Sequence, residues 1–242
     1  MAEGQHALPE GQEEKFLKYA AFLSRNKWRI VAGVSLVVAV LLVIALVQSL
    51  RKRKEARAFQ AHREAKTAKD HQRVGENFAG TSYGSFSLIE AGNLLFRKER
   101  YAEARKLYMK FLRSYPESRF RPWVYNLVGA TFEAEQKYDQ AIHYYGKAQD
   151  FSSVELQAKL NRGRCWELKG DLQSEKNPKL ALDHYDKART FYQQLTGTGS
   201  SPRVSPQMPS PWGAQAQSRM RSLGEKETKA RESEKKVDRS GR

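Results

Sequence analysis

Hydrophobic and polar positions divide the chain into regions of different character. Residues Ile30 to Leu50 form an apolar run without a single charged residue. A helix of about 20 residues spans the hydrocarbon core of a bilayer, so this run predicts a transmembrane helix. The run ends in the basic sequence RKRK, Arg51 to Lys54, rather than in a small-residue cleavage site. We therefore expect a retained membrane anchor and not a signal peptide.

The segments on both sides of this run predict helices of other kinds. Lys15 to Lys27 places its apolar residues on one side, as in a helix at a membrane surface. Arg51 to about Asp70 contains neither Gly nor Pro, so we expect the helix to leave the membrane as a basic stem. Four cations of this stem are placed to contact anionic lipid headgroups: Arg51, Lys52, Arg53 and Lys54.

From residue 81 to residue 196 the apolar positions have helical spacing and recur. A small residue is followed four positions later by an aromatic residue, so both lie on one helical face. This occurs in ERYAEARKLYMKFLRSYP, QKYDQAIHYYGKAQDF and NPKLALDHYDKARTFY, and a helical pattern containing a glycine precedes each copy. The recurring positions are Gly92, Ala104, Tyr108, then Gly129, Ala141, Tyr145, then Gly163, Ala181 and Tyr185.

This recurrence resembles the tetratricopeptide repeat, which consists of two antiparallel helices in about 34 residues. Gly129 and Gly163 are 34 positions apart. The small residues would let the two helices approach closely, and the aromatic residues would fill the gaps. The resemblance implies an all-α fold, with a single transmembrane helix followed by an α-solenoid of about three helical hairpins. The third copy has extra residues around Asp171 to Asn177, where we expect an irregular loop.

No motif in the sequence predicts catalysis, a cofactor or a metal site. The acid, histidine and tyrosines of KYDQAIHYYGKA, residues 137 to 148, fit the polar side of a repeat helix. The five histidines lack zinc-ligand spacing, and we expect the lone Cys165 to be a small buried residue. Phosphate-binding glycine loops and nucleophile elbows are missing from the sequence. We therefore predict a protein that is not an enzyme.

The net charge of +16 makes anionic partners worth considering. Nucleic acid is not expected, because the aromatic residues fall on the buried faces and much of the excess charge lies beside the membrane or in the tail. Stacked helix pairs usually present a concave, peptide-binding surface lined by the first helix of each pair. The candidates for this lining are Asn93, Arg97, Asn126, Glu133, Arg164 and Glu167. The alternative is that these side chains are simply solvated.

Both ends of the chain are polar and predict disorder. Four of the eight prolines fall among Ser and Gly after residue 197. The predicted organisation is a disordered tail (1–14), an interfacial and transmembrane segment (15–50, span 30–50), a basic stem (51–80), the repeat domain (81–196) and a disordered basic tail (197–242).

The order of these parts and the sequence EEKFLKYAAFLSRNKWRIVAGV resemble the bacterial ancillary subunit family of the Sec translocon. This resemblance implies a single-pass protein of the bacterial inner membrane with a periplasmic repeat domain. It also implies a chaperone-like role in protein secretion or envelope biogenesis, through binding of protein or peptide segments. The basic residues flanking the span are nearly balanced and do not fix the orientation. Two alternatives stay open: a scaffold that self-associates into homo-oligomers, and a cytoplasmic-facing adaptor for acidic partners.

Overall fold

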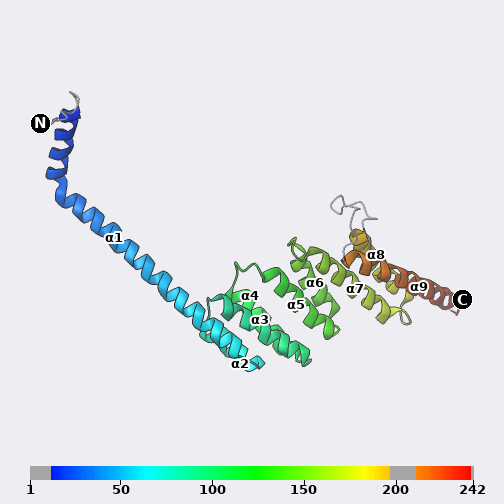
Figure 1. Ribbon diagram of the computed structural model, residues 1–242. Helices are drawn as coiled ribbons and strands as arrows, with labels where there is room; N and C mark the ends of the chain where they lie inside the picture. Colours follow the sequence, from blue (N-terminus) through cyan, green and yellow to red (C-terminus); the bar gives the residue numbers. More distant parts are fainter. Residues whose placement is uncertain (1–11, 197–210, 241–242) are drawn as a thin grey trace, which may run out of the picture. The chain divides into compact units, whose positions relative to one another are not determined.

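The computed structural model describes residues 12–196 and 211–240, which form nine helices and no strand (Figure 1). The predicted all-α class is therefore confirmed. Most of the predicted N-terminal tail, residues 1–14, lies outside the described residues, and its last positions belong to α1, which begins at Gln12. The chain divides into two compact units, and the boundary along the sequence lies between Ala56 and Arg57.

The first unit is formed by α1, Gln12–Glu64, as far as Ala56. Its large apolar side chains from Ile30 to Leu50 are exposed, and none of its most apolar stretch is buried. Within the described residues, α1 is the one helix that is long and apolar enough to cross a membrane. Moving such a surface from water into hydrocarbon is favourable by about 25 cal/mol for each Å².

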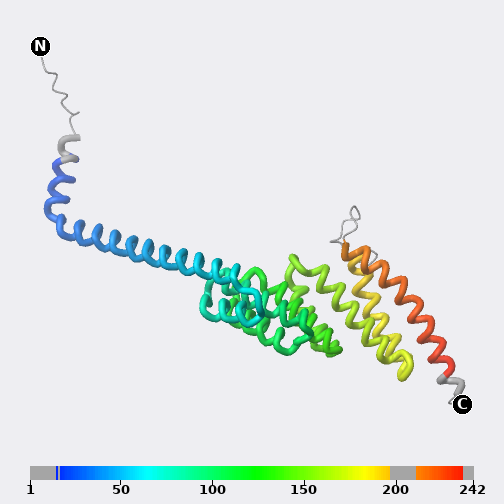
Figure 2. Tube along the Cα trace, turned by 60° about the horizontal axis from the view of Figure 1, so that its bottom comes forward, coloured from blue at the N-terminus to red at the C-terminus, as the bar shows by residue number. Residues whose placement is uncertain are grey.

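The N-terminal part of α1 carries two side chains that bond to its own backbone. Ser24 Oγ donates to the carbonyl oxygen of Ala21 at 2.9 Å, and Asn26 Nδ2 donates to that of Phe22 at 3.1 Å. Such bonds often bend a helix, and α1 bends in its dark blue part (Figures 1 and 2). The predicted interfacial segment, Lys15 to Lys27, is thus continuous with the apolar helix.

The second unit begins inside α1, at Arg57. Ala58 is fully buried, and the ring of Phe59 lies 4.8 Å from the ring of Tyr83 in α3. His62 Nδ1 is hydrogen-bonded to Ser87 Oγ at 2.8 Å. The last turns of α1 are therefore part of the packed unit, which starts earlier than the predicted boundary at residue 81.

The predicted stem also changes direction at Thr67. The Thr67 side chain accepts from the backbone N–H of Asp70, and the Asp70 side chain accepts from the backbone N–H of Thr67. This capping box starts a new helix, α2, Ala68–Asn77. α2 packs against α3.

The rest of the unit is a succession of helices that each pack against the next one along the chain. Their bounds are α3 Ser82–Arg97, α4 Tyr101–Ser114, α5 Arg121–Ala134, α6 Tyr138–Gln149, α7 Glu155–Gln173, α8 Pro178–Thr196 and α9 Pro211–Ser240. Glu99 and Gln136 lie in the short connections after α3 and after α5, and both have a φ of 58°. The α3–α4 and α5–α6 pairs therefore share one turn geometry.

Close contact between a glycine and a tyrosine ring holds the two helices of these pairs together. A Cβ atom added at Gly92 would lie 2.4 Å from the Tyr108 ring, and one at Gly129 would lie 2.6 Å from the Tyr145 ring. Both distances are shorter than van der Waals contact, so only a residue without Cβ permits this packing. Ala104 and Ala141, four positions before each tyrosine, are fully buried.

The third pair, α7 and α8, differs from the prediction. Tyr185 packs against Gly170 rather than Gly163, and Gly163 faces Tyr192 instead. The extra residues do not form an irregular loop, because α7 continues to Gln173 and α8 begins at Pro178. They lengthen the helices and give this pair two glycine–tyrosine contacts.

The prediction of a disordered tail is wrong for residues 211–240, which form α9. α9 packs against α8 and α7 (Figure 2). Its buried residues Ala216, Leu223 and Ala230 recur every seven positions and join the same apolar cluster as Tyr185 and Tyr192. α9 thus packs through a narrow face of two alanines and one leucine. The low overall hydrophobicity of residues 211–240 did not reveal this face in the sequence. The remainder of the predicted tail, residues 197–210, lies outside the described residues.

Replacing Gly129 by Ala tests the glycine–tyrosine contact. We expect a loss of about 1–3 kcal/mol in the free energy of unfolding, because the new methyl group overlaps the Tyr145 ring. Urea unfolding of the full chain in detergent micelles, followed by circular dichroism, measures this loss. Gly146→Ala is the matched control, since its nearest neighbour would be at an ordinary 3.9 Å and a helical alanine is favoured. Equal stability of the two variants would refute the role given to Gly129.

Candidate interaction surface

Three of the six predicted groove residues form hydrogen bonds inside the protein. Glu133 and Arg164 bond to each other, and Asn93 bonds to the facing helix of its own pair. Arg164 of α7 donates to both carboxylate oxygens of Glu133 of α5, at 2.6 and 2.7 Å. The same carboxylate accepts from the Tyr145 hydroxyl at 2.7 Å. Asn93 of α3 accepts from the Tyr108 hydroxyl at 2.8 Å. Polar residues expected to face a ligand therefore hold the tyrosines in place.

A further predicted residue, Asn126, is almost entirely buried between α5 and α7. Only 5% of it is exposed, and its Oδ1 accepts from Asn161 Nδ2 at 3.3 Å. Arg97, by contrast, is exposed at the end of α3. Within the described residues the structure thus brings Glu133 together with Arg164, but it does not bring Asn93, Arg97 or Asn126 into that cluster.

Glu167, the last predicted groove residue, is covered by α9. Only 4% of it is exposed. Its carboxylate accepts from the Tyr192 hydroxyl at 2.7 Å, from Lys226 Nζ at 2.8 Å and from Arg219 Nη1 at 3.1 Å. Lys226 also donates to Asp171 at 2.7 Å. The acidic end of the predicted groove is therefore occupied by basic residues of the same chain.

Sequence reasoning missed the contribution of α9 because its partners are distant in the sequence. The signal was present as the seven-residue recurrence of Ala216, Leu223 and Ala230, which is typical of a helix that packs along one seam. A fourth ion pair of α9, between Arg189 of α8 and Glu227, lies at this seam. The cations and acids of α9 that looked like a solvated tail include its anchoring groups.

Burial sets the protonation state of three other side chains, one cysteine and two histidines. Cys165 is fully buried, and its burial raises the pKa of the thiol, so it is protonated at neutral pH. Burial lowers the pKa of His71 and of His184, which favours their neutral forms. Among the described residues, no three His, Cys, Asp or Glu side chains are grouped so that they could hold a metal ion.

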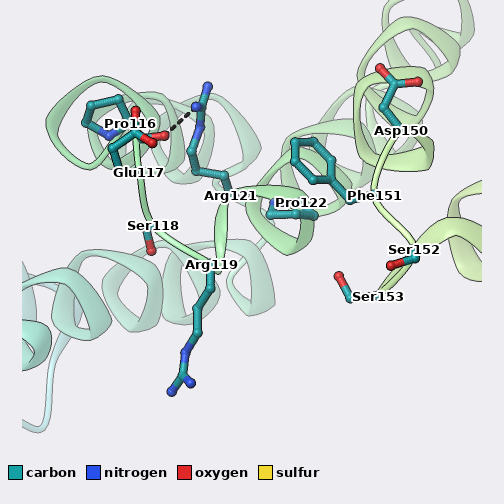
Figure 3. A pocket seen from close by; sticks show the side chains of 10 residues that line it. All are labelled: Pro116, Glu117, Ser118, Arg119, Arg121, Pro122, Asp150, Phe151, Ser152 and Ser153. Carbon is teal, nitrogen blue, oxygen red and sulfur yellow. Dashed lines mark hydrogen bonds between the residues drawn. The ribbon is translucent and has the colours of Figure 1, made fainter.

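A surface pocket of about 510 Å³ lies where the connection between α4 and α5 meets the connection between α6 and α7 (Figure 3). Pro116 to Arg119, with Arg121 and Pro122, contribute one side, and Asp150 to Ser153 contribute the other. Arg121 Nη1 donates to the carbonyl oxygen of Pro116, and the side chain of Arg119 extends away from the other labelled residues. Because Glu117 and Asp150 offset the two arginines, this pocket favours no single class of charged ligand.

No protein family and no curated protein matches this sequence. Among solved structures, the chain is similar to the crystal structure of BtubC (BKLC) from P. vanneervenii, with 16% sequence identity and a TM-score of 0.39. The alignment covers 83% of this chain and 79% of that chain. At this score the likeness supports no argument about fold or function. Over residues 12–196 and 211–240, the structure shows a helical protein with one helix that is long and apolar enough to cross a membrane.

Replacing Glu167 by Gln tests whether the buried carboxylate holds α9. We expect the docking of α9 to weaken by about 2 kcal/mol, because hydrogen bonds to a charged group are lost or weakened. Amide hydrogen exchange of the full chain should then be faster in α9 and unchanged in α3 to α6. Glu225→Gln is the matched control, since Glu225 is exposed on α9. Unchanged exchange in the Glu167 variant would show that apolar packing alone holds α9.

The pH response of the same exchange experiment follows from the pKa of Glu167. Burial alone would raise this pKa, but hydrogen bonds from Lys226 and Tyr192 and nearby positive charge bring it below its ordinary value of 4.5. A carboxylate with a depressed pKa stabilises the folded state above its unfolded pKa and loses this effect as the pH falls through the folded value. The protection of α9 amides, taken relative to their intrinsic exchange rate at each pH, should therefore decrease on acidification below pH 4.5, and the Glu167→Gln variant should lack this decrease.

Proposed function

We propose that the protein is a non-enzymatic, membrane-anchored protein–protein interaction module built from tetratricopeptide-like helical hairpins. The observation that carries this proposal is the exposed apolar helix α1, which leads directly into a succession of paired helices. The recurrent contacts of Gly92 with Tyr108 and of Gly129 with Tyr145 support the assignment of these pairs to one repeat type. Repeat arrays of this kind bind protein segments along extended surfaces.

Anchoring would serve binding by restricting where the module can diffuse. A binding surface tethered to the membrane by α1 meets membrane-bound partners at a raised effective concentration. Affinities that are weak in solution then suffice for association. This favours partners that are themselves in the membrane or emerge from it.

A role beside the Sec translocon, or in envelope biogenesis, is our more specific proposal. Its support is the order of anchor and helical pairs together with the membrane-entry sequence that follows Glu13. Binding of secreted chains by a periplasmic second unit would make the protein a chaperone-like accessory factor. The self-association alternative supposes two exposed ends of the repeat array, and it is weakened because α9 packs against α7 and α8 at one of these ends.

Photo-crosslinking in intact membranes tests the interaction function. We expect the full chain to crosslink to a translocon component or to a secreted chain, and a variant that lacks residues 30–50 to lose these products. The deletion variant is a suitable control because the second unit begins only at Arg57. Recovery of cytosolic proteins alone, or of no protein, would refute the proposal.

Protease accessibility tests the side of the membrane on which the second unit lies. For a periplasmic unit, protease added to bacterial spheroplasts should digest residues 57–242 without detergent. Protection of these residues until the membrane is dissolved would place them in the cytoplasm. That result would favour the adaptor for acidic partners over the secretion factor.

A further inference from the structure

A second pocket, of about 410 Å³, opens between α4, the C-terminal end of α5 and α6. It combines three cations with apolar walls and has no acidic lining residue. Its principal lining residues are Arg105, Lys106, Met109, Arg113, Phe132 and Tyr144.

The apolar wall is a stack of side chains. The rings of Phe132 and Tyr144 are stacked, with centroids 5.4 Å apart and an interplanar angle of 16°. The guanidinium of Arg105 lies 4.2 Å from the centroid of Phe132 and is paired with Glu135 at 3.1 Å. Arg105 is therefore held as part of the wall, and the wall is preorganised for an apolar side chain. Met109, beside it, can adapt to different side-chain shapes.

The other two cations of the pocket, Lys106 and Arg113, are not held in the apolar wall as Arg105 is. Lys106 and Arg113 are exposed, and neither forms an ion pair within the part of the chain that the structure describes. They are seven positions apart on α4, which places them on one face about 10 Å from each other along the helix axis. In an extended peptide alternate side chains point to the same side, so side chains four positions apart lie on one face about 13 Å from each other. The long, flexible side chains of Lys106 and Arg113 can reach two acidic residues at this spacing, with an apolar residue midway between them on the same face.

Two other charged pockets of the second unit differ from this pocket because acidic residues line them. The pocket between the two connections includes Glu117 and Asp150. A pocket between α2 and α4 balances its cations with Glu76 and Glu103. A fourth pocket, lined by Tyr115, Arg119 and Phe120, also lacks acidic lining residues, but it contains a single cation. The combination of no acidic lining residue with two cations, Lys106 and Arg113, that form no ion pair within the described residues thus distinguishes the α4–α6 pocket among these four.

We propose that the α4–α6 pocket binds an acidic segment of a partner protein that carries one large apolar side chain. This side chain would pack on Met109 and the Phe132–Tyr144 stack, while flanking carboxylates would pair with Lys106 and Arg113. The inference rests on the proposed interaction function and names the class of its partner. Nucleic acid fits less well, because two cations around one pocket do not form the long basic track that a phosphate backbone follows.

Fluorescence anisotropy with the full chain in detergent micelles tests this proposal. The probe is a labelled Gly/Ser peptide with two Glu residues four positions apart and a Leu or Phe midway between them. We expect the combined Lys106→Glu and Arg113→Glu substitutions to weaken binding by about tenfold or more, since both carboxylates would meet like charge. A Ser in place of the apolar residue of the probe should weaken binding similarly. Lys229→Glu, on the exposed face of α9, is the matched control and should bind as the unmodified chain does.

Three results would overturn the proposal. One is equal binding by the unmodified chain and the double variant, and another is an equal loss with Lys229→Glu, which would indicate nonspecific attraction to net charge. The third is displacement of the probe by single-stranded DNA at lower concentration than by unlabelled peptide. The crosslinking experiment separates this inference from the proposed function. If the double variant keeps all crosslinks of the unmodified chain, the pocket is not the site while the interaction function stands, whereas an unmodified chain without protein crosslinks contradicts the function itself.

Discussion

The close approach of paired helices depends on glycines that leave room for tyrosine rings. At Gly92 and Gly129 even a methyl group would overlap the ring of the facing tyrosine. The contact therefore fixes both the distance between two helices and their register along each other. Because each helix also packs on the next one, this local constraint extends from α3 to α9. Loss of one contact would disturb two neighbouring interfaces.

The tyrosines also link the interior of the second unit to its polar residues. Each ring is buried, while its hydroxyl donates to a polar side chain: Tyr108 to Asn93, Tyr145 to Glu133, Tyr185 to Asp171 and Tyr192 to Glu167. A buried hydroxyl without a partner would cost about 1–3 kcal/mol, so these acceptors are required by the packing. This explains why residues that looked like a ligand-binding set are already engaged. The binding site that we propose lies instead between α4 and α6, where Lys106 and Arg113 form no ion pair within the described residues.

The sequence allowed the first two helix pairs to be predicted because their signals are local. Gly92 with Tyr108 and Gly129 with Tyr145 have the same spacing, and the short connections leave little freedom in the pairing. In the third pair Gly163 and Gly170 compete for the same role, so spacing alone selected the wrong partner for Tyr185. The environment of Glu167 could not be predicted in this way, because Lys226 lies 59 positions further along the chain. Which acids are covered and which are open depends on such distant contacts.

The second unit contains two kinds of helix interface, and their stability depends differently on salt and pH. The α3–α4 and α5–α6 pairs rest on aromatic packing, which changes little with salt or moderate acid. The α9 interface buries two alanines and one leucine, with Trp212 and Met220 partly buried beside them. Its charged contacts are Lys226 and Arg219 with Glu167, Lys226 with Asp171, and Arg189 with Glu227. The carboxylates of Glu167, Asp171 and Glu227 make this interface depend on charge in a way that the α3–α4 and α5–α6 ring contacts do not. Acid should therefore release α9 before it disturbs those helix pairs.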